Sequence, residues 1–320
     1  MGCGGCGWQH IEPQAQRALK RGIVIDALRR IAHLQHAYVV DGPPLSATGY
    51  RTTVRVAAGP DGVAGFRAEH THDVVAAPAC LIAHPVLAKL LPTLRLDPAV
   101  EPTLRTSVAT GELAARWDRA AGEVHGLPAG TAIGSAAVLE ELVAGQRLRV
   151  SMGSFFQSGP QAAELLVDAV QRAAPELRGA RLVVDAYAGV GMLAACATDP
   201  MSKLIAIETS RSACADAERN LGHRDARVVR GEVGGWHAEA GTEVDVVIAD
   251  PARSGLGKPG VAALTRLEAP IIVLVSCDAA SLSRDAKLLA HAGYDHERSE
   301  LVDTFPHTTH VEVVTRFVRR

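Results

Sequence analysis

RLVVDAYAGVGMLAACA, residues 181–197, is the stretch that decides the fold we expect for this chain. Residues 181–185 are a β-branched apolar run typical of a buried strand, and the stretch ends in helix-like sequence. Between them, Gly189 and Gly191 allow the backbone to approach a ligand closely, and the start of a helix favours polar or anionic groups. A G-x-G turn alone is a weak signal, so its surroundings decide what it means.

Strand-like and helix-like stretches alternate from residue 154 onward. The expected strands are 181–185, 204–208, 226–230, 244–249 and 271–276, and the expected helices are 161–174, 210–222, 260–267 and 281–291. This alternation predicts an α/β fold with a parallel, doubly wound sheet. Two β-rich stretches with a tight connection, 295–303 and 310–318, end the chain, and we expect the last strand to run antiparallel.

The first half of the chain has a different pattern. Residues 12–35 show helical spacing of apolar residues with a basic face. Residues 48–79 alternate β-branched positions around a Gly-Pro-Asp-Gly turn, which predicts a hairpin. Residues 82–150 mix short helices and strands. We therefore expect two domains, a smaller α+β region at 1–150 and a doubly wound domain at 151–320.

Composition limits the possible partners. The chain has 320 residues, 48% of them hydrophobic, a mean hydropathy of +0.10 and a net charge of −2. No apolar run approaches the roughly 18 residues that span a membrane, and no signal peptide is visible, so we expect a cytoplasmic protein. RNA binding would depend on local basic clusters, although each is equally well a solvated face. The candidate clusters are Arg17, Lys20, Arg21, Arg29 and Arg30, and Arg316, Arg319 and Arg320.

Four further residues carry chemistry at the ends of expected strands. Glu208 ends the second strand, about 20 residues after the glycine turn, where an acid can hold ribose hydroxyls. Asp250 follows the fourth strand and begins a Gly-rich loop. Cys277 follows the fifth strand, and Glu312 begins the last one. A thiolate can attack carbon and a carboxylate can then remove a proton, so the last two suit nucleophilic catalysis.

The other cysteines do not suggest a disulfide scaffold. Cys196 and Cys214 lie in apolar, helix-like sequence, and we expect both in the core. Cys3 and Cys6 form C-G-G-C, and Cys80 follows at a distance. A C-x-x-C pair serves metal, iron–sulfur or redox sites, and one pair with one distant cysteine is a weak signal.

Together these segments resemble the RNA uracil-5-methyltransferases, the S-adenosylmethionine enzymes that form 5-methyluridine in tRNA or 23S rRNA. The resemblance covers almost the whole chain. It is carried by CGGCGWQH (3–10), GYRTTVR (49–55), GFRAEHTHDVV (65–75), FFQSGPQAAELL (155–166), DAYAGVG (185–191), DPARSGLG (250–257), SCDAASLSRD (276–285) and FPHTTHVE (305–312). The last two are the most specific pair.

The resemblance implies a class I, Rossmann-like methyltransferase domain and a role for each site residue. Cys277 resembles the nucleophile that adds to carbon-6 of uracil, and Glu312 the base that removes the carbon-5 proton. Gln157 and Asp250 lie in motifs that contact the target base or the cofactor. The remaining matches to the S-adenosylmethionine pocket are Asp185, Gly189, Gly191 and Glu208. The implied partner is RNA, with no membrane or protein partner.

Two departures from the family pattern matter. The family often reads Ser-Cys-Asn-Pro where this chain has Asp278 and Ala279, and an acid beside the nucleophile is expected to raise its pKa modestly. Family members with a 4Fe–4S cluster use four cysteines, and Cys3, Cys6 and Cys80 match the last three. The first, and a small β-barrel, would precede Met1, so we expect a fragment or shortened member with a labile cluster or none.

Two alternatives remain open at the level of sequence. One keeps the enzyme class and changes the target, either to carbon-5 of cytosine or to an exocyclic nitrogen. Only methylation of the nitrogen needs no cysteine nucleophile. The other is an RNA-binding or folding factor without turnover. Neither the substrate RNA nor the oligomeric state is legible in the sequence.

Overall fold

The structure, a computed structural model, describes residues 2–69, 71–76 and 80–320, and within these residues eight strands form one large sheet. Its strands, in order, are β1 (Val39–Asp41), β18 (Tyr294–Leu301), β19 (Val313–Arg319), β17 (Ile271–Ser276), β16 (Val246–Ala249), β13 (Leu182–Ala186), β14 (Lys203–Glu208) and β15 (Ala226–Arg230). Neighbours from β17 to β15 pair in parallel, whereas β19 is antiparallel to both β17 and β18. The predicted α/β fold and its antiparallel last strand are confirmed.

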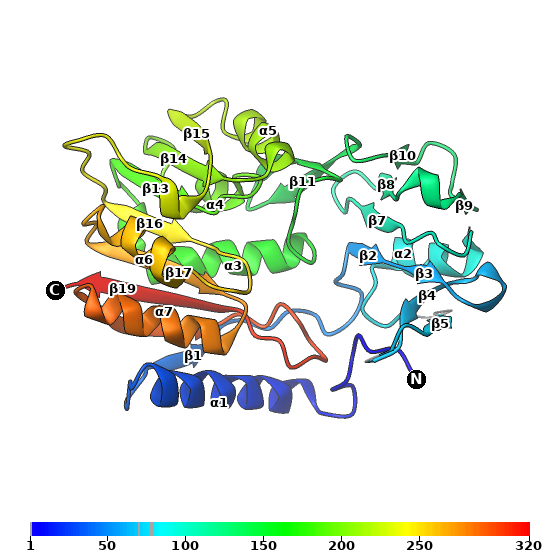
Figure 1. The fold of residues 1–320 in the computed structure, drawn as a ribbon, viewed down its shortest axis with the longest axis horizontal. Coiled ribbons are helices and arrows are strands. Elements are labelled where there is room, and N and C mark those ends of the chain that lie inside the picture. Colours follow the sequence, from blue (N-terminus) through cyan, green and yellow to red (C-terminus); the bar gives the residue numbers. More distant parts are fainter. Residues whose placement is uncertain (1, 70, 77–79) are drawn as a thin grey trace.

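Helices cover both faces of this sheet (Figure 1). Alternate residues of a strand point to opposite faces, and accordingly Val183 and Val184 of β13 belong to two different apolar clusters. One cluster includes residues of α3 (Pro160–Ala173) and α4 (Met192–Ala197), beside α5 (Arg211–Asn220). The other includes residues of α1 (Pro13–Ile31), α6 (Gly257–Thr265) and α7 (Ala279–His291). Cys196 and Cys214 are buried, as predicted.

Strand β1 is part of the large sheet and helix α1 packs beside it, although the domain division expected from sequence placed both in the region 1–150. Strand β1 pairs in parallel with β18, with Val39 opposite Ser299, and α1 lies beside α7 (Figure 1). The sequence division missed this because a three-residue strand has no alternation to read. The division of the remaining chain near residue 150 stays a prediction.

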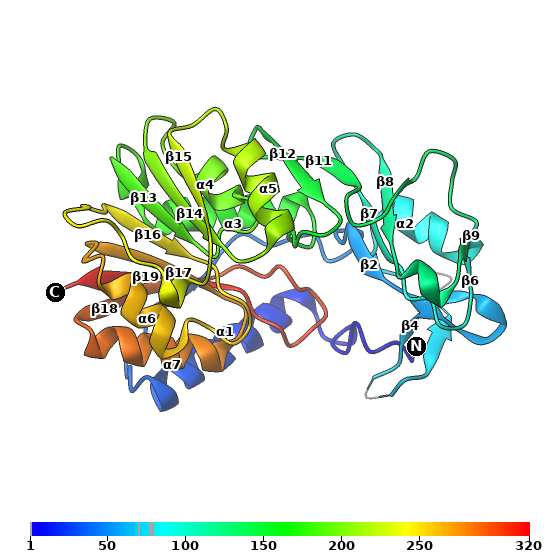
Figure 2. The same cartoon turned by 45° about the horizontal axis from the view of Figure 1, so that its top comes forward.

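Residues 50–151, at the right of Figure 2, contain short strands arranged in several small sheets. The predicted hairpin corresponds to β3, β4 and β5, with its turn at Gly59–Gly62; residues 70 and 77–79 of that stretch lie outside the described residues. The elements are β2 (Thr53–Arg55), β3 (Ala57–Ala58), β4 (Ala64–Arg67), β5 (Val74–Ala76), α2 (Pro85–Leu90), β6 (Arg95–Leu96), β7 (Thr103–Thr106), β8 (Leu113–Arg116), β9 (Val124–His125), β10 (Ala132–Ile133), β11 (Val138–Val143) and β12 (Gln146–Ser151).

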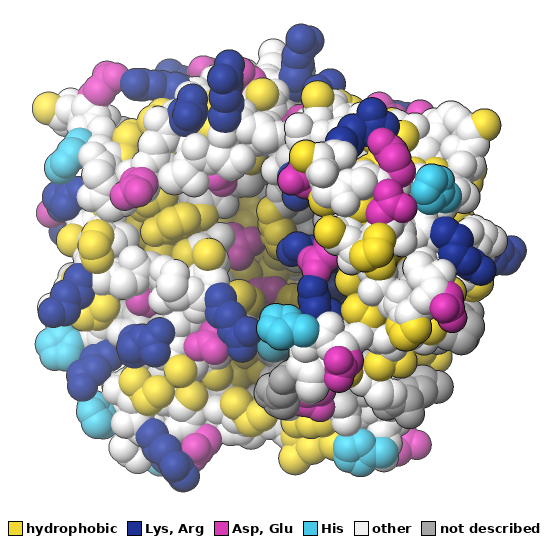
Figure 3. All heavy atoms as spheres, turned by 45° about the vertical axis from the view of Figure 1, so that its right-hand side comes forward, with side chains coloured by type: hydrophobic (Ala, Val, Ile, Leu, Met, Phe, Trp, Pro, Cys, Tyr) yellow, Lys and Arg dark blue, Asp and Glu magenta, His cyan; other side chains and the backbone are white. Residues whose placement is uncertain are grey.

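The surface is hollowed between these two parts of the molecule (Figure 3). Hydrophobic side chains lie deep in the hollow, and acidic and basic side chains stand around it. No helix in the described part of the chain is long and apolar enough to cross a membrane.

Candidate active site

A cavity of about 590 Å³ lies at the carboxyl ends of β13, β14, β16 and β17. Ligands of open α/β sheets bind in this position. Seven predicted site residues line it: Gln157, Asp185, Gly189, Glu208, Asp250, Cys277 and Glu312. Among the residues matched to the methyl-donor pocket, Gly191 does not line the cavity; it is the residue that precedes α4. The structure therefore brings together residues that are up to 155 positions apart in sequence.

The sheet register places Cys277 beside Glu312. Ser276, the last residue of β17, pairs with Val313, the first residue of β19. Cys277 directly follows Ser276, and Glu312 directly precedes Val313 on the antiparallel partner strand. Cys277 is half-buried and Glu312 is 4% exposed. A nucleophile and a carboxyl group thus share one end of two paired strands.

The glycine turn and Glu208 form one hydrogen-bonded unit. Gly189 has φ +56° and Gly191 has φ +80°, and both values favour glycine. The Gly189 N–H donates to Glu208 Oε2 at 2.9 Å, while Thr209 and Ser210 N–H each donate to Oε1 at 2.7 Å. These bonds hold the Glu208 carboxylate at the cavity wall with acceptor capacity left on Oε2.

Asp185 is 1% exposed, and only one of its two carboxylate oxygens has a hydrogen-bond partner among the described residues. Its Oδ2 accepts the Ala194 N–H at 3.0 Å, but its Oδ1 has no hydrogen-bond partner among the described residues. Burial, with smaller contributions from the charges of Asp250 and Glu208, raises the pKa of Asp185 to about 7. An orphaned carboxylate oxygen in a cavity wall suits a donor on a ligand.

Asp250, Glu312 and Cys277 also favour their neutral forms. Desolvation raises the pKa of Asp250 to about 7. Burial, with the charge of Asp250, raises the pKa of Glu312 well above its ordinary value. Burial raises the pKa of the Cys277 thiol to about 11, with further contributions from Glu312 and Asp250. Crowded carboxyl groups of this kind are typical of functional sites and favour a cationic ligand.

The chain is similar over nearly its whole length to known proteins. It is 32% identical to an uncharacterized RNA methyltransferase of Streptomyces avermitilis, covering 98% of this chain and 79% of that one. It is 31% identical to another from Streptomyces coelicolor, covering 98% and 75%. The chain belongs to the RNA methyltransferases. No family model matches it.

A solved structure also matches the fold of this RNA methyltransferase. It is the Pyrococcus abyssi tRNA (uracil-54, C5)-methyltransferase in complex with S-adenosyl-L-homocysteine. The two chains share 24% sequence identity with a TM-score of 0.72, and the match covers 99% of this chain and 86% of the other. At this identity the match shows the shared fold.

The loop that leads to Glu312 in this RNA methyltransferase, residues 302–312, is held by α1. Lys20 Nζ lies 2.6 Å from Asp303 Oδ1 and donates to the Phe305 carbonyl at 2.8 Å. Lys20 is fully buried, which excludes it from the basic surface patch proposed from the sequence. The helical pattern placed it on a polar face, but that face is covered by the loop.

His307 ties the same loop to three other segments. Gln16 Oε1 accepts the His307 N–H at 2.7 Å, and the Gln16 side-chain nitrogen lies 3.2 Å from His307 Nδ1. His307 Nε2 lies 2.9 Å from the Ala47 carbonyl, and the His307 carbonyl accepts the Trp8 N–H at 3.0 Å. These contacts hold His307 at φ +66° and give it a structural role in the loop.

The other charges of the predicted patches engage protein groups rather than forming a free basic face. Arg316 is 9% exposed and pairs with Glu176 and Glu297. The remaining members contact a carbonyl or carboxylate: Arg17 with Gly42, Arg21 with Asp41, Arg29 and Arg30 with Asp26, Arg319 with Glu268, and Arg320 with Asp295. The sequence could not reveal these partners, most of which lie outside the local pattern.

Asp278 does not act on the nucleophile as the sequence suggested. Its side chain accepts the Ser281 N–H at 2.8 Å and caps α7, and it lies 3.8 Å from Arg253. The groups that raise the pKa of Cys277 are Glu312 and Asp250, after burial itself. Asp278 therefore begins a helix and restrains Arg253.

Among the further residues that line the cavity, four large side chains had no role assigned from sequence: Phe155, Tyr187, Arg253 and Phe305. Phe155 is 74% exposed, an unusual position for a phenyl ring. Tyr187 has φ +66°, a strained value for a bulky residue that often marks a functional site. All four fall inside the quoted motifs, which was the available signal.

The N-terminal cysteines make an incomplete metal site. The pKa of Cys6 is raised first by burial and also by its proximity to Cys80 and Cys3, so the three thiols lie near one another. Across residues 2–69, 71–76 and 80–320, no group of three or more His, Cys, Asp or Glu side chains is arranged to hold a metal ion. The residues present do not fit a 4Fe–4S cluster, and the predicted lability of such a cluster stays a prediction.

Proposed function

We propose that this RNA methyltransferase transfers a methyl group from S-adenosylmethionine to carbon-5 of a uridine in tRNA or 23S rRNA. The observation that carries the proposal is the pairing of Cys277 and Glu312 across β17 and β19, at the wall of one cavity with the glycine turn. Methylation of a nitrogen needs no thiol, and a binding factor needs neither group.

The cavity suits the proposed methyl donor. S-adenosylmethionine supplies an electrophilic methyl group on a sulfonium cation. Glu208, at the end of β14, is placed to accept ribose hydroxyls through its remaining lone pairs. Asp185 Oδ1, which lacks a partner among the described residues, is placed to accept an ammonium donor. The glycine turn leaves open space beside Gly189, because a Cβ added to that residue would meet no atom within 4 Å.

Cys277 activates the base by addition. Its thiolate forms a bond to carbon-6 of uracil, and the electron pair of the carbon-5–carbon-6 double bond moves into an enolate at carbon-4. Carbon-5 then takes the methyl group. Because the Cys277 thiol is protonated at neutral pH, a base must receive its proton first. Asp250, with a pKa of about 7 and a charge that acts on the thiol, is suited to receive it.

Glu312 completes the reaction. Burial favours the protonated form of Glu312, so its own proton must first leave to solvent. The resulting carboxylate takes the proton from carbon-5, the electron pair of that C–H bond restores the carbon-5–carbon-6 double bond, and the carbon–sulfur bond breaks with its electron pair on Cys277. The raised pKa of Glu312 makes it a stronger base than an exposed carboxylate.

The target base must leave its stack to reach Cys277. Phe155, exposed at the cavity wall, offers a ring face on which a flipped base can stack. Gln157, 7% exposed and facing the same cavity, offers an amide for the edge of the base. Asp250 in its protonated form can donate to a uracil carbonyl oxygen.

A trapping experiment tests the proposal. The purified protein is mixed with S-adenosylmethionine and cellular RNA substituted with 5-fluorouracil. Fluorine at carbon-5 cannot leave as a proton, so the thioether to Cys277 should persist through denaturation. Mass spectrometry then locates the adduct on the protein, and sequencing of the attached RNA identifies the substrate.

The matched controls are Cys277→Ala, which should give no adduct, and Cys196→Ala, which removes a buried thiol outside the cavity and should give the adduct at the wild-type level. Absence of an adduct from folded wild-type protein that binds S-adenosylhomocysteine would overturn the carbon-5 assignment. Nitrogen methylation by Cys277→Ala would establish the alternative.

A further inference from the structure

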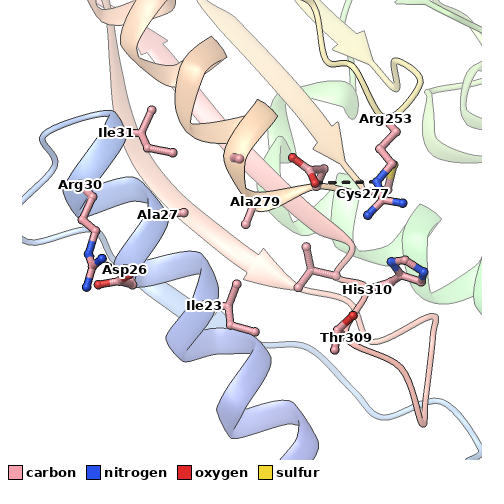
Figure 4. A pocket seen from close by; sticks show the side chains of 13 residues that line it. Ile23, Asp26, Ala27, Arg30, Ile31, Arg253, Cys277, Ala279, Thr309 and His310 are labelled. Carbon is pink, nitrogen blue, oxygen red and sulfur yellow. Dashed lines mark ion pairs between the residues drawn. The ribbon is translucent and has the colours of Figure 1, made fainter. Parts of the chain in front are cut away.

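A second hollow of about 410 Å³ lies on the other side of Cys277, between α1 and α7 (Figure 4). Ile23, Ala27 and Ile31 project into it from α1, opposite Ala279 of α7. Thr309 and His310 lie at one end. We name this hollow the α1–α7 groove. It shares two lining residues with the larger cavity, Cys277 and Arg253, so the proposed nucleophile stands where the two spaces meet.

The connectivity of a pyrimidine nucleotide determines what must lie beside Cys277. The sulfur adds to carbon-6, and carbon-6 is bonded directly to nitrogen-1, which carries the ribose. The ribose and its two phosphates must therefore lie close to Cys277 Sγ. The side of the larger cavity near Gly189 and Glu208 is assigned to the methyl donor. The α1–α7 groove adjoins Cys277 on the other side and offers space for the ribose and its phosphates.

The charges along the groove suit a phosphate at one end. Arg253 has a 66% exposed side chain, and its contact with Asp278, at 3.8 Å, is loose. His310 lies near it in Figure 4. Burial first, and then the charges of Arg253, Lys20 and Arg51, lower the pKa of His310, while Asp278 opposes them. A phosphate would counter this local excess of positive charge. The facing carboxylates are Asp278 and Asp26, the latter paired with Arg30 at 3.0 Å.

The groove also has an apolar wall. Ile23 is 42% exposed although it faces a concave surface, and Ala27 and Ile31 continue its row along the helix. Exposed apolar side chains in a concavity suit the face of a sugar or base.

We propose that the α1–α7 groove binds the ribose of the target uridine and the phosphate and sugar of the adjoining RNA nucleotide, with Arg253 and His310 at the phosphate and Ile23 beneath the sugar. This subsite rests on the proposed function, because it is derived from where carbon-6 must lie. It assigns to α1 a direct contact with RNA.

Two substitutions at Ile23, one acidic and one basic, test whether the α1–α7 groove binds an RNA phosphate. The measured quantity is the concentration of 5-fluorouracil-substituted tRNA and rRNA that gives half-maximal covalent adduct. Ile23→Asp should raise it about tenfold through repulsion of the phosphate, while Ile23→Lys should leave it unchanged or lower it. Leu19→Asp is the matched control, because Leu19 is 49% exposed one turn earlier on α1 and does not line the groove. It should behave as wild type.

A salt titration tests the phosphate contact itself. Loss of one phosphate contact in Arg253→Gln should reduce the slope of log affinity against log salt by about 0.7, the value for single strands. Calorimetry with S-adenosylhomocysteine should give the same Kd for wild type and all Ile23 variants.

The outcomes separate the groove from the proposed function. If wild type forms the adduct and Ile23→Asp half-saturates at the wild-type RNA concentration, the groove does not bind RNA, and the carbon-5 chemistry stands. Equal weakening by Ile23→Asp and Ile23→Lys would likewise overturn the phosphate assignment in favour of a packing role. If wild type forms no adduct with any RNA, the proposed function fails and the groove proposal fails with it.

Discussion

The large sheet and the small sheets of residues 50–151 are stabilised differently. Strands β16 and β17 are buried along their whole length, and α-helices cover the sheet on both sides. The small sheets have strands of two to four residues outside the β11–β12 hairpin, and smaller apolar clusters lie among them. The proposed catalytic groups, Cys277 and Glu312, therefore stand at one end of the more deeply buried sheet.

Charged groups show the same contrast. In the large sheet's half, Lys20 and Asp303 pair with side chains 0% and 5% exposed. In the small sheets, Glu101 pairs with Arg55 and Arg67, whose side chains are 70% and 44% exposed. Buried pairs are costly to break, whereas exposed pairs contribute little. In this comparison the buried Lys20–Asp303 pair holds the loop of residues 302–312, whereas the pairs of Glu101 lie at the surface.

The largest expected effect separates catalysis from stability. Cys277→Ala should lower kcat by about 10⁴-fold or more, because loss of a nucleophile removes the covalent route. Its melting temperature should stay near that of wild type, since Cys277 is half-buried at the end of β17. Methyl incorporation and calorimetry measure the two quantities. Substantial turnover by this variant would contradict the assigned role.

Breaking the buried pair should be the largest effect on stability. Lys20→Met leaves Asp303 buried without its cation and should lower the free energy of unfolding by about 3–5 kcal/mol. The double variant Lys20→Met, Asp303→Leu should recover most of that loss. Urea denaturation of wild type, Lys20→Met, Asp303→Leu and the double variant gives the coupling energy between the two residues. A coupling near zero would show that the pair does not hold the loop.

The pH dependence of the free energy of unfolding should distinguish the acidic residues of the cavity from those at the surface. The folded state holds the proton of Asp250 up to a pKa of about 7, whereas the ordinary value is 3.8. Between these values unfolding releases the proton, so the contribution of Asp250 to stability is present below about pH 4 and is lost as the pH rises through 7. The stability of Asp250→Asn relative to wild type should therefore increase from pH 4 to pH 7 in ligand-free protein.

Denaturation curves at several pH values measure this difference. Asp245→Asn is the control, because backbone N–H groups and Arg181 lower the pKa of Asp245 from its ordinary 3.8 despite desolvation. Its titration therefore lies below the range tested, and the stability difference between Asp245→Asn and wild type should stay constant from pH 4 to pH 7. A constant difference between wild type and Asp250→Asn across this range would show that Asp250 titrates normally.

The smallest effect should come from the small sheets. Glu101→Gln removes two exposed ion pairs and should change the free energy of unfolding by less than about 1 kcal/mol. The effect should vanish in 1 M salt, since exposed charges are screened there. A loss as large as that of Lys20→Met would erase the contrast between the two halves.

Local pattern predicted the catalytic sheet well because its strands are uninterrupted apolar runs bounded by glycine or acidic residues. It predicted the wall of the cavity because Asp185, Glu208, Asp250 and Cys277 each lie at or near the carboxyl end of such a run. The position of Glu312 beside Cys277 needed the family resemblance, since antiparallel pairing is not visible in either run alone.

What the sequence did not reveal depends on contacts between remote segments. Lys20 looks like any basic residue on a helix face until Asp303, 283 positions away, is placed over it. Strand β1 is too short to have a pattern and exists only because β18 offers an edge. The α1–α7 groove is formed by α1, α7 and residues 309–311, which are far apart in sequence, so no single stretch of sequence could indicate it.

The pairing of β1 with β18 also has a consequence for synthesis on the ribosome. Helix α1 and β1 are made well before their partners α7 and β18, which follow residue 278. Val24 and Leu28, which end 0% exposed, must remain without their final cover during the translation of the intervening residues. Helix α1 therefore docks late, and the loop of residues 302–312 gains its contacts with Lys20 and Gln16 only then.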